Sequence, residues 1–395
     1  MTSTSCSRIA EELLAQCLAG APPAKLPREL LDEPCGQALF GIWVEGLADR
    51  FEPALCDMYA RLFAQAAAHV DRSMDPESLV ARYQRVRRVR PASGNPRRVF
   101  VLSRVTLGAD VAVTSVLMAA ARRRFPDAGL FFAGPRKNFE LFAGDAGIHH
   151  APLEYRRGSL RERLAAAEEL KQLFRDPDTL VIDPDSRLTQ LGLVPVCAED
   201  RYYFFESRAY GAVSERSLPE LASAWAEETF GVAGSAPFFA LENEPPRGAH
   251  IAISLGVGEN AAKRIPDPFE EELLALLGQS GHCLAVDAGA GGAEAERVRR
   301  AVAHSKVQAK LWDGSFAGFA SIIAGSRLYV GYDSAGQHVA AAAGAPLISI
   351  FAGFPTSRMF ARWRPTGATA TVIRVDRPDP AETLRRVCEA LRAHA

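Results

Sequence analysis

The sequence lacks any excess of charge of one sign. Its 46 lysines and arginines are balanced by 47 aspartates and glutamates, so the formal net charge is −1. Proteins that bind nucleic acid through its phosphates carry a marked basic excess, and this balance therefore argues against nucleic acid as a partner. The 395 residues are 48% hydrophobic and 24% charged, a composition typical of a soluble globular protein with about two to four domains.

A long hydrophobic run is also missing. The longest uncharged apolar stretch, around 335–353, is interrupted by Gly344 and Pro346 and falls short of the roughly 20 apolar residues of a membrane-spanning helix. Near the N-terminus, Arg8 and Glu11 stand where a secretory leader has its apolar core. The sequence therefore predicts a cytoplasmic protein without a transmembrane helix.

Cysteine is scarce and follows no spacing motif. The seven cysteines are odd in number, scattered, and contain no C-x-x-C pair, which argues against a zinc site and against a disulfide framework. We therefore expect a reduced chain. The cysteines are Cys6, Cys17, Cys35, Cys56, Cys197, Cys283 and Cys388.

Residues 1 to about 90 have apolar residues at helical spacing, as in 9–17, and no convincing strand. The arginine-rich stretch 82–90 and the prolines and glycine of 91–96 close this segment. We predict a helical N-terminal extension over 1–96, whose arginine-rich end is a candidate for peripheral contact with the anionic inner membrane surface. The aromatic residues expected to pack it against the rest of the chain are Phe40, Trp43, Phe51, Tyr59 and Phe63.

From Val99 the pattern changes to short apolar runs, each followed by a turn and a helix-length segment. Such runs, without strict alternation, are typical of strands buried on both faces of a parallel sheet. They fall into two groups, within 97–246 and 247–395, separated by the proline-containing stretch 241–247, which has the composition of a linker. We predict two doubly wound α/β domains facing a cleft. The expected strands are 99–103, 130–133, 180–182, 251–254, 283–286, 328–331 and 347–351.

In open parallel sheets, ligands bind beyond the carboxyl ends of the strands, where turns lead into helix N-termini. The first such turn, SRVTLGADVAV, has Gly108 and then Asp110 before an expected helix over 111–124. Asp110 is open to two interpretations. It is either the N-cap of that helix or a carboxylate held at the mouth of the cleft as a general base.

The second turn, LGVGENAAKRIPDPFEE, combines a glycine loop with two cations, Lys263 and Arg264, which suit a diphosphate. Asp267, Pro268 and Glu270 have the spacing of a helix start with an N-cap, a proline at the first position and a capping-box partner. The alternative interpretation is a solvated basic loop. The spacing does not match the P-loop pattern.

The third turn, LYVGYDSAGQHVAAAAGAP, carries the sharpest signal. Asp333, Ser334 and Gly336 precede a helix expected over about 337–343. The N–H groups at its start, the Ser334 hydroxyl and the positive end of the helix dipole predict an anion site. His338 points toward the same place, although a lone helical histidine is more often structural.

Three stretches together resemble glycosyltransferase family 9, which includes the ADP-heptose:lipopolysaccharide heptosyltransferases. SRVTLGADVAVTSVLMAAARRRFPDAGLFFAG resembles the family's opening R-x-S-x-L-G-D pattern. SLGVGENAAKRIPDPFEEEL resembles the start of its donor domain, which ends in K-x-W-P, and YDSAGQHVAAAAGAPLISIFAGFPT resembles D-[ST]-G-x-x-H-L-A-A-A-x-G-x-P. The resemblance covers about residues 97–390. It implies a GT-B fold, with a Rossmann-like acceptor-side domain (97–246) and a Rossmann-like nucleotide-sugar donor domain (247–395).

The resemblance further implies an inverting, metal-independent transfer without a cofactor. A sugar, with heptose among the candidates, would move from a nucleotide diphosphate sugar to a glycan or glycolipid acceptor such as the lipopolysaccharide core. Asp110 would be the general base, and Lys263 would neutralise the leaving diphosphate. Glu294 would bind the nucleotide ribose, with Glu296 two residues away as the alternative. The other implied donor-site residues are Asp333, Ser334, Gly336 and His338.

Basic residues at strand ends of the first α/β half are candidates for receiving an anionic acceptor. The string Asp183-Pro184-Asp185 in the same half has a D-x-D spacing, and we interpret it as a loop lining the cleft rather than as a metal site. The acceptor candidates are Arg104, Arg136, Lys137 and Arg187.

The chain departs from the family pattern at informative positions. Asp110 lies one residue later than expected, which predicts either a displaced base or a bulged turn, and Ile265 stands where the family has tryptophan. Two other functions stay open. One is a nucleotide-sugar epimerase of similar architecture, and the other is a protein that binds a nucleotide sugar without transferring it.

Overall fold

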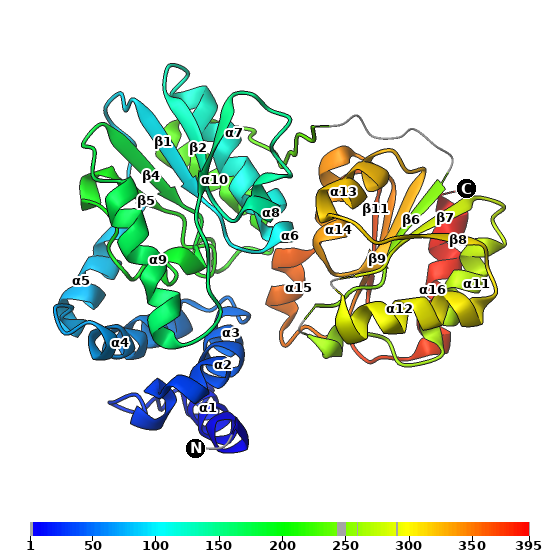
Figure 1. Cartoon of the computed structure of the whole chain (residues 1–395), viewed down its shortest axis with the longest axis horizontal. Helices are drawn as coiled ribbons and strands as arrows, with labels where there is room; N and C mark the ends of the chain where they lie inside the picture. Colours follow the sequence, from blue (N-terminus) through cyan, green and yellow to red (C-terminus); the bar gives the residue numbers. More distant parts are fainter. Residues whose placement is uncertain (1–2, 243–249, 259, 290, 395) are drawn as a thin grey trace. The chain divides into compact units, whose positions relative to one another are not determined.

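The computed structural model of the chain describes residues 3–242, 250–258, 260–289 and 291–394 (Figure 1). The chain divides into two compact units, each built around one parallel sheet. The first unit comprises Met1–Val105, Val116–Phe139 and Gly147–Ala236, and the second comprises Thr106–Ser115, Glu140–Ala146 and Pro237–Ala395. The predicted α/β class with two separate parallel sheets is confirmed. The predicted boundary at 246/247 and most of the linker 241–247 lie outside the described residues, so these domain limits stay predictions.

The N-terminal extension is helical, as predicted. Its helices are joined by the short 3-10 turns Arg28–Leu31 and Glu33–Cys35 and by a π-helical turn, Leu39–Val44. They are α1 (Ser3–Leu18), α2 (Gly36–Ala38), α3 (Glu45–Ala48), α4 (Pro53–Val70) and α5 (Pro76–Val86).

The first unit holds a five-stranded parallel sheet in the order β3-β2-β1-β4-β5. Its strands are β1 (Arg98–Leu102), β2 (Gly129–Gly134), β3 (Ile148–Pro152), β4 (Thr179–Asp183) and β5 (Tyr202–Phe204). Its helices are α7 (Ser115–Arg124), α8 (Arg136–Phe139), α9 (Leu160–Leu173) and α10 (Leu218–Phe230). Phe100, Leu102 and Val181 of the sheet share one core with α9 and the N-terminal extension. The extension is therefore part of this unit's core.

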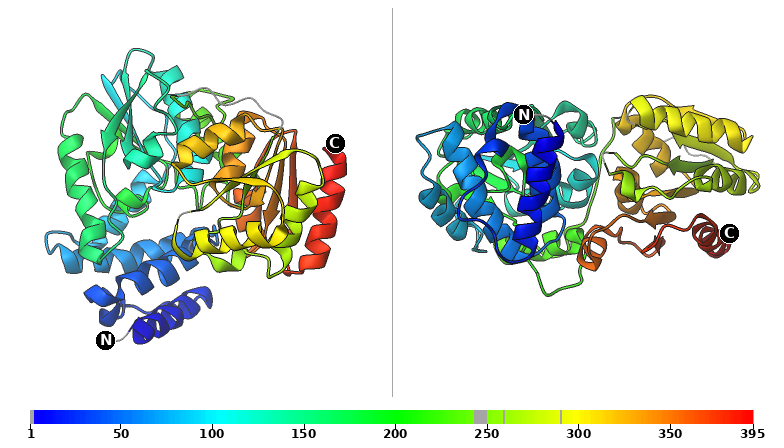
Figure 2. Two further views of the ribbon diagram at one scale, coloured as in Figure 1. Left: turned by 45° about the vertical axis from the view of Figure 1, so that its right-hand side comes forward. Right: turned by 90° about the horizontal axis from the view of Figure 1, so that it is seen from below.

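The second unit holds a six-stranded parallel sheet in the order β11-β10-β9-β6-β7-β8. On one face α11 packs between α12 and α16, and on the other α13 packs against α14 (Figure 2). The strands are β6 (His250–Ser254), β7 (Cys283–Asp287), β8 (Ala309–Trp312), β9 (Leu328–Tyr332), β10 (Leu347–Phe351) and β11 (Ala370–Arg374). The helices are α11 (Phe269–Gly278), α12 (Gly292–Ser305), α13 (Phe316–Ala324), α14 (Ala335–Ala343), α15 (Ser357–Trp363) and α16 (Pro380–Ala393).

All seven predicted strands are present, and the four that the sequence analysis missed are the edge strands β3, β5, β8 and β11. An edge strand has a neighbour on one side only, so it needs no continuous apolar run. β8, for example, reads AKLW with Lys310 and Leu311 exposed. β5 has only three residues, too few for a recognisable pattern.

The arginines at the end of the extension tie it to the sheet. Arg82 donates a hydrogen bond to the carbonyl oxygen of Gly192 at 2.9 Å, and Arg87 Nε donates to Glu206 Oε2 at 2.8 Å. Arg90 lies over the ring of Tyr203, 4.2 Å from its centroid. Most of the run proposed for membrane contact is thus engaged within the first unit.

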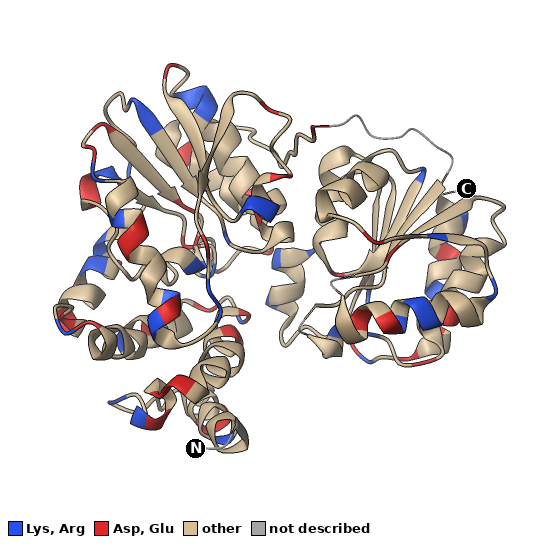
Figure 3. Ribbon diagram, in the orientation of Figure 1, with Lys and Arg blue, Asp and Glu red and all other residues tan. Residues whose placement is uncertain are grey.

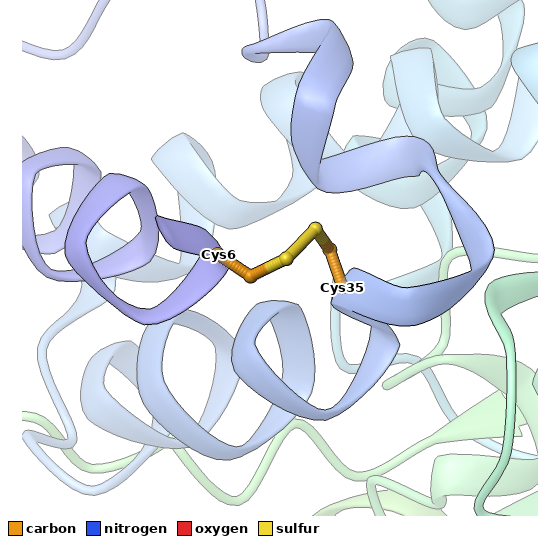
Figure 4. Close-up of a disulfide and its surroundings, with 2 residues drawn as sticks. All are labelled: Cys6 and Cys35. Carbon is orange, nitrogen blue, oxygen red and sulfur yellow. A yellow bond between two sulfur atoms is a disulfide. The ribbon is translucent and has the colours of Figure 1, made fainter. Parts of the chain in front are cut away.

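A disulfide joins Cys6 of α1 to Cys35 (Figure 4). This overturns the prediction of a chain without disulfides. The two cysteines are 29 residues apart, and their Cα atoms come within 5.2 Å because α1 folds back along the segment that precedes α2. No motif in the sequence marks such a pair. The five other cysteines are free.

Basic and acidic residues are interspersed on both units (Figure 3), in keeping with the small net charge. No helix in the described part of the chain is long and apolar enough to cross a membrane.

Candidate functional site

The second sheet has a topological switch point between β6 and β9. From β6 the chain continues outward through β7 and β8, whereas β9 leads to β10 and β11 on the other side. The loops that follow β6 and β9 therefore diverge, and this is where open parallel sheets bind ligands. The loop after β6 leads to Lys263, and the turn after β9 leads into α14.

Lys263 and Asp333 meet at this switch point. Lys263 Nζ lies 2.7 Å from Asp333 Oδ2 and donates a further hydrogen bond to the carbonyl oxygen of Asp333 at 3.2 Å. The two side chains are 19% and 6% exposed. Gln337 Nε2 also donates to Asp333 Oδ1. The lysine charge is thus held against the strand end that precedes α14, close to the place where the sequence expected a diphosphate.

The N-terminus of α14 supplies further groups for an anion. Its N-cap, Ser334, has an extended backbone and makes no side-chain capping bond. The first N–H groups of a helix have no intrahelical acceptor, and the helix dipole adds positive charge there. The helix begins at Ala335, two residues before the expected start. A Cβ atom on Gly336 would lie 2.7 Å from Cζ of Tyr329, so a glycine is needed for this turn to pack on that ring.

His338 lies in the first turn of α14, and its side chain is uncharged at neutral pH. Burial lowers the pKa of His338 to about 4, against the opposing effect of Asp333, and Lys263 lowers it further. Its ring packs edge-on against Trp363 with centroids 5.8 Å apart. His338 therefore contributes shape and polarity to this region rather than positive charge.

Glu294, the residue proposed for the ribose, folds back on the glycine loop after β6. Its Oε2 atom accepts hydrogen bonds from the backbone N–H groups of Val257 at 2.9 Å and Gly258 at 3.0 Å. Glu296, the alternative, is exposed. The geometry places Glu294 beside the loop that leads to Lys263, while its ribose role stays a prediction.

The expected helix start at 267–270 is wrong in detail. α11 begins at Phe269, and its N-cap makes no side-chain capping bond. Glu270 is only 1% exposed and accepts a hydrogen bond from Arg264 Nε at 3.1 Å and another from Arg297. Arg264 thus pairs with Glu270, and with Asp267 as well, rather than with the group that holds Lys263.

Asp110 is not a helix N-cap. The helix starts earlier, with α6 (Leu107–Ala109), and continues through a π-helical turn, Asp110–Thr114, into α7. The Asp110 side chain is fully buried, and its Oδ1 atom accepts a hydrogen bond from the Thr114 hydroxyl at 2.7 Å. A π-helical turn absorbs one extra residue in a helix. The irregular turn thus begins at Asp110 itself, and a displaced base or a bulged turn relative to the family pattern stays a prediction.

The segment that carries Asp110 packs on the start of α14, within the second unit. A Cβ atom on Gly108 would lie 3.0 Å from Cα of Ala335 and 3.0 Å from Cδ2 of His338. Gly108 therefore allows a close backbone approach that no other residue permits. The structure brings the segment 106–115, the start of α14 and the Lys263–Asp333 pair into one unit.

The four acceptor candidates lie in the first unit and have different surroundings. Arg104 donates a hydrogen bond to Ser207 Oγ at 2.8 Å and another to the carbonyl oxygen of Pro184. Arg136 and Lys137 are exposed on the short helix α8 after β2. Arg187 instead pairs with Glu45 of the extension at 2.7 Å.

The Asp183-Pro184-Asp185 string is buried rather than open to a cleft. Asp183 accepts hydrogen bonds from the backbone N–H of Ser186 and from two hydroxyl groups, those of Thr189 and Tyr202. Asp185 pairs with Arg208 at 2.9 Å, and the two side chains are 0% and 4% exposed. Both carboxylates thus hold the turn after β4. Within the described residues, no group of three or more His, Cys, Asp or Glu side chains could hold a metal ion.

Gln337 is a site residue that the sequence analysis missed. Besides binding Asp333, its Nε2 atom donates to the carbonyl oxygen of Trp363 at 3.2 Å, and its Oε1 atom accepts a hydrogen bond from the Ser349 hydroxyl. It therefore connects α14 to β10 and to the end of α15. The only signal in the sequence is its place in the first turn of the helix.

Comparisons with known proteins find a family model that matches part of the sequence and solved structures of similar fold. The sequence model of glycosyltransferase family 9 (heptosyltransferase) matches residues 222–394. The structure of E. coli heptosyltransferase WaaC with ADP is similar over 75% of this chain and 100% of that chain, at 17% identity and a TM-score of 0.57. E. coli ADP-heptose lps heptosyltransferase II is similar over 75% and 98%, at 20% identity and a TM-score of 0.53.

A family 9 glycosyltransferase from Veillonella parvula DSM 2008 is similar over 77% of this chain and 99% of that chain, at 15% identity and a TM-score of 0.57. No curated protein matches the chain in sequence. At these identities the structural matches show the fold, which is the GT-B fold of two Rossmann-like halves.

Proposed function

Residues 222–394 belong to glycosyltransferase family 9, and from this premise we propose that the chain transfers a sugar from a nucleotide diphosphate sugar to a glycan or glycolipid acceptor, with inversion at the anomeric carbon and without a metal ion. The observation that carries the proposal is the Lys263–Asp333 pair beside the uncapped N-terminus of α14. A cation and a helix N-terminus, side by side at a switch point, are suited to a diphosphate.

The donor site stabilises the leaving group. Lys263 exchanges Asp333 for a diphosphate oxygen, while the first N–H groups of α14 and the Ser334 hydroxyl bind the other oxygens. As the bond between the anomeric carbon and the diphosphate breaks, its electron pair stays on the diphosphate, and these preorganised donors meet the growing charge. Glu294 binds the ribose. Heptosyltransferase WaaC is known with ADP, so an ADP-activated heptose is the first donor to test.

The acceptor side supplies the base. Asp110 takes the proton of the acceptor hydroxyl as its oxygen attacks the anomeric carbon, and a single displacement inverts that centre. Arg104, Arg136 and Lys137 receive an anionic acceptor such as the lipopolysaccharide core. The enzyme acts in the cytoplasm, at the inner surface of the membrane that holds a glycolipid acceptor.

The burial of Asp110 favours a second candidate, a protein that binds a nucleotide sugar without transferring it. A carboxylate that is fully buried and bonded to Thr114 must become accessible before it can act as a base. The two candidates share the donor site and differ only in turnover.

The decisive experiment measures nucleotide affinity by titration calorimetry with ADP, GDP, UDP and dTDP, each with magnesium or with EDTA. We expect one nucleoside diphosphate to bind equally well in both buffers. Lys263→Met should weaken it by ~10- to 100-fold, because a charge-assisted contact is lost. The control is Lys171→Met, which removes an exposed lysine paired with Glu168 in the first unit and should leave the affinity unchanged.

If none of the nucleotides binds, the donor-site proposal is wrong. Where one binds, product analysis of its sugar conjugates with wild type and Asp110→Asn separates the functions. A transferase yields free nucleoside diphosphate and an elongated acceptor and loses turnover in the variant. An epimerase yields an isomerised nucleotide sugar, and a binding protein yields neither product.

A further inference from the structure

A cluster of charged residues surrounds Glu270, a few residues after Lys263 in the chain. At its centre, Glu270 of α11 is 1% exposed and accepts hydrogen bonds from Arg264 Nε at 3.1 Å, from Arg297 Nη1 and from the Tyr332 hydroxyl at 3.2 Å. All three bonds end on the same oxygen, Oε1. Two arginines and a tyrosine from three different segments therefore converge on one carboxylate.

Each partner of Glu270 leads to the loop that carries Lys263. Arg264 follows Lys263 in sequence. Arg297 Nη2 donates to the carbonyl oxygen of Leu255 at 2.9 Å, at the beginning of the loop. Tyr332 Oη accepts a hydrogen bond from the backbone N–H of Ile265 at 3.3 Å. The cluster thus fastens both ends of the loop after β6, of which residues 255–258 and 260–265 are described.

The same cluster reaches the partner of Lys263. Tyr332 is the last residue of β9, and the next residue is Asp333. Arg297 lies one turn after Glu294 on α12, and Glu294 binds the N–H groups of Val257 and Gly258 in the same loop. The loop is therefore held at its two ends by Glu270 and in its middle by Glu294.

A merely stabilising role does not require such a cluster. Burying a carboxylate beside two guanidinium groups that keep only part of their contact with water costs more than packing apolar residues of similar volume. Such an ion cluster is therefore weak evidence for stability. A lysine has a flexible four-carbon stem, and its charge is placed accurately only when its backbone is fixed. The cluster supplies that rigidity through the hydrogen bonds of Arg264, Arg297 and Tyr332.

We propose that Glu270 is a positioning residue for the diphosphate-binding lysine. Through Arg264, Arg297 and Tyr332 it sets the backbone at residues 255 and 264–265, so that Lys263 Nζ lies beside the N-terminus of α14. This inference rests on the proposed donor site and adds a group that does not touch the nucleotide.

The test compares Glu270→Gln with wild type by calorimetric titration of the tightest-binding nucleoside diphosphate and of the corresponding nucleoside. We expect a ~10-fold loss of affinity for the diphosphate and none for the nucleoside, because only the phosphates meet Lys263. The matched control is Glu271→Gln. Glu271 is the next residue on the same helix and pairs with His304 of α12 at 2.8 Å, 36% exposed. The control should bind as wild type does.

A double variant shows whether the effect passes through Lys263. When Lys263 is already methionine, adding Glu270→Gln should lower the affinity for the nucleoside diphosphate by less than ~2-fold, because there is no lysine charge left to position. The proposal is overturned if Glu270→Gln weakens the diphosphate by the same factor with and without the lysine. An equal loss for the nucleoside also overturns it, because that result indicates general damage to the unit.

If Glu270→Gln does not melt cooperatively and is therefore not properly folded, variants of Arg297 test the same proposal. Arg297→Met should lose diphosphate affinity, and Arg297→Lys should recover part of it, because a cation near Glu270 is restored. Wild-type affinity in Arg297→Met rejects the inference. The proposed function fails separately, when wild type itself binds no nucleoside diphosphate. If Lys263→Met loses affinity for the nucleoside diphosphate and Glu270→Gln keeps it, only the positioning role of Glu270 is rejected.

Discussion

Gly353 and Lys263 are in direct backbone contact. A Cβ atom on Gly353 would lie 2.6 Å from the backbone nitrogen of Lys263 and 2.5 Å from the carbonyl oxygen of Ala262. Gly353 also has a φ of +70°, in the left-handed region that favours glycine. The loop after β10 therefore reaches the short 3-10 turn Ala261–Lys263 only because residue 353 has no side chain.

Gly353→Ala should weaken nucleotide binding as well as folding. The methyl group must displace the Ala261–Lys263 turn, and a shift of the lysine by a fraction of an ångström should cost ~10-fold in affinity for the nucleoside diphosphate. The measurement is calorimetric affinity together with the melting temperature.

Gly344→Ala is the matched control for this variant. Gly344 has nearly the same φ, +69°, but a Cβ atom there meets nothing within 4 Å. Both variants should lose about 1 kcal/mol of stability from backbone strain, and only Gly353→Ala should lose affinity. Equal affinities in the two variants contradict the contact argument.

His338 makes the second unit sensitive to acid. Burial lowers its pKa to about 4 in the folded state, against about 6.5 in an unfolded chain. Between these values the unfolded chain binds a proton that the folded chain does not, so stability falls as the pH is lowered from 6.5 to 4, by up to about 3 kcal/mol.

His338→Gln should therefore flatten the dependence of stability on pH in this window, as measured by urea unfolding at several pH values. Asp183 contributes with the opposite sign, because burial raises its pKa to about 6 and the folded state then binds the proton more tightly. That contribution is common to wild type and variant and cancels in the comparison. Parallel pH profiles of the two proteins are the result that excludes this role of His338.

Removal of the Cys6–Cys35 disulfide should destabilise the first unit. The bond closes a loop of 29 residues, and in the chain-entropy account a loop of this size contributes about 3–4 kcal/mol. The Cys6→Ser variant and reduced wild type should therefore both melt at a lower temperature than oxidised wild type, and their two melting temperatures should be equal. Cys283→Ser removes an exposed free thiol and should melt as wild type does in both conditions. If reduction leaves the melting temperature of wild type unchanged, the disulfide does not stabilise this unit.

Two arginines of the N-terminal extension, two residues apart, should differ widely in importance. Arg87 pairs with Glu206, which is 4% exposed, whereas Arg85 pairs with Glu199, which is 39% exposed. Arg87→Met takes the ion-pair partner from the buried Glu206 carboxylate, which keeps only its hydrogen bond from Tyr83 and the more distant charge of Arg208, and should cost about 3–5 kcal/mol of unfolding free energy. Arg85→Met should cost at most about 1 kcal/mol. Urea unfolding followed by tryptophan fluorescence measures both, and equal losses contradict the inference that the extension is fastened through Arg87.

The interior of each sheet was predictable because its strands are buried on both faces. A strand such as 347–351, LISIF, is buried at every position and is apolar at all of them except Ser349, and such a run is visible in sequence. The edge strands do not need a continuous apolar run, and they are the strands that the sequence analysis missed. The helical nature of residues 3–86 was predictable for the same kind of reason, since apolar residues recur at the helical period.

The candidate site also has parts that could be predicted from the sequence and parts that could not. The turn after β9 could be recognised because Asp333, Ser334 and Gly336 adjoin a helix start, and local backbone chemistry requires those residue types. The partner of Lys263 could not be read from sequence, since Asp333 lies 70 residues away and the spacing carries no signal. The capping-box interpretation of Glu270 failed for a related reason. Its true partners, Arg297 and Tyr332, are distant, and a buried ion pair outweighs a local cap.

The sequence by itself determined the α/β class, the positions of the buried strands and the turns that could bind a phosphate, because local periodicity and turn chemistry act over a few residues. Only the tertiary structure decided the pairing of Lys263 with Asp333, the burial of Asp110 in a π-helical turn, the Cys6–Cys35 disulfide and the arginine contacts of the N-terminal extension. These depend on side chains that meet across long separations, where the strengths of burial and charge, rather than spacing, select the partner.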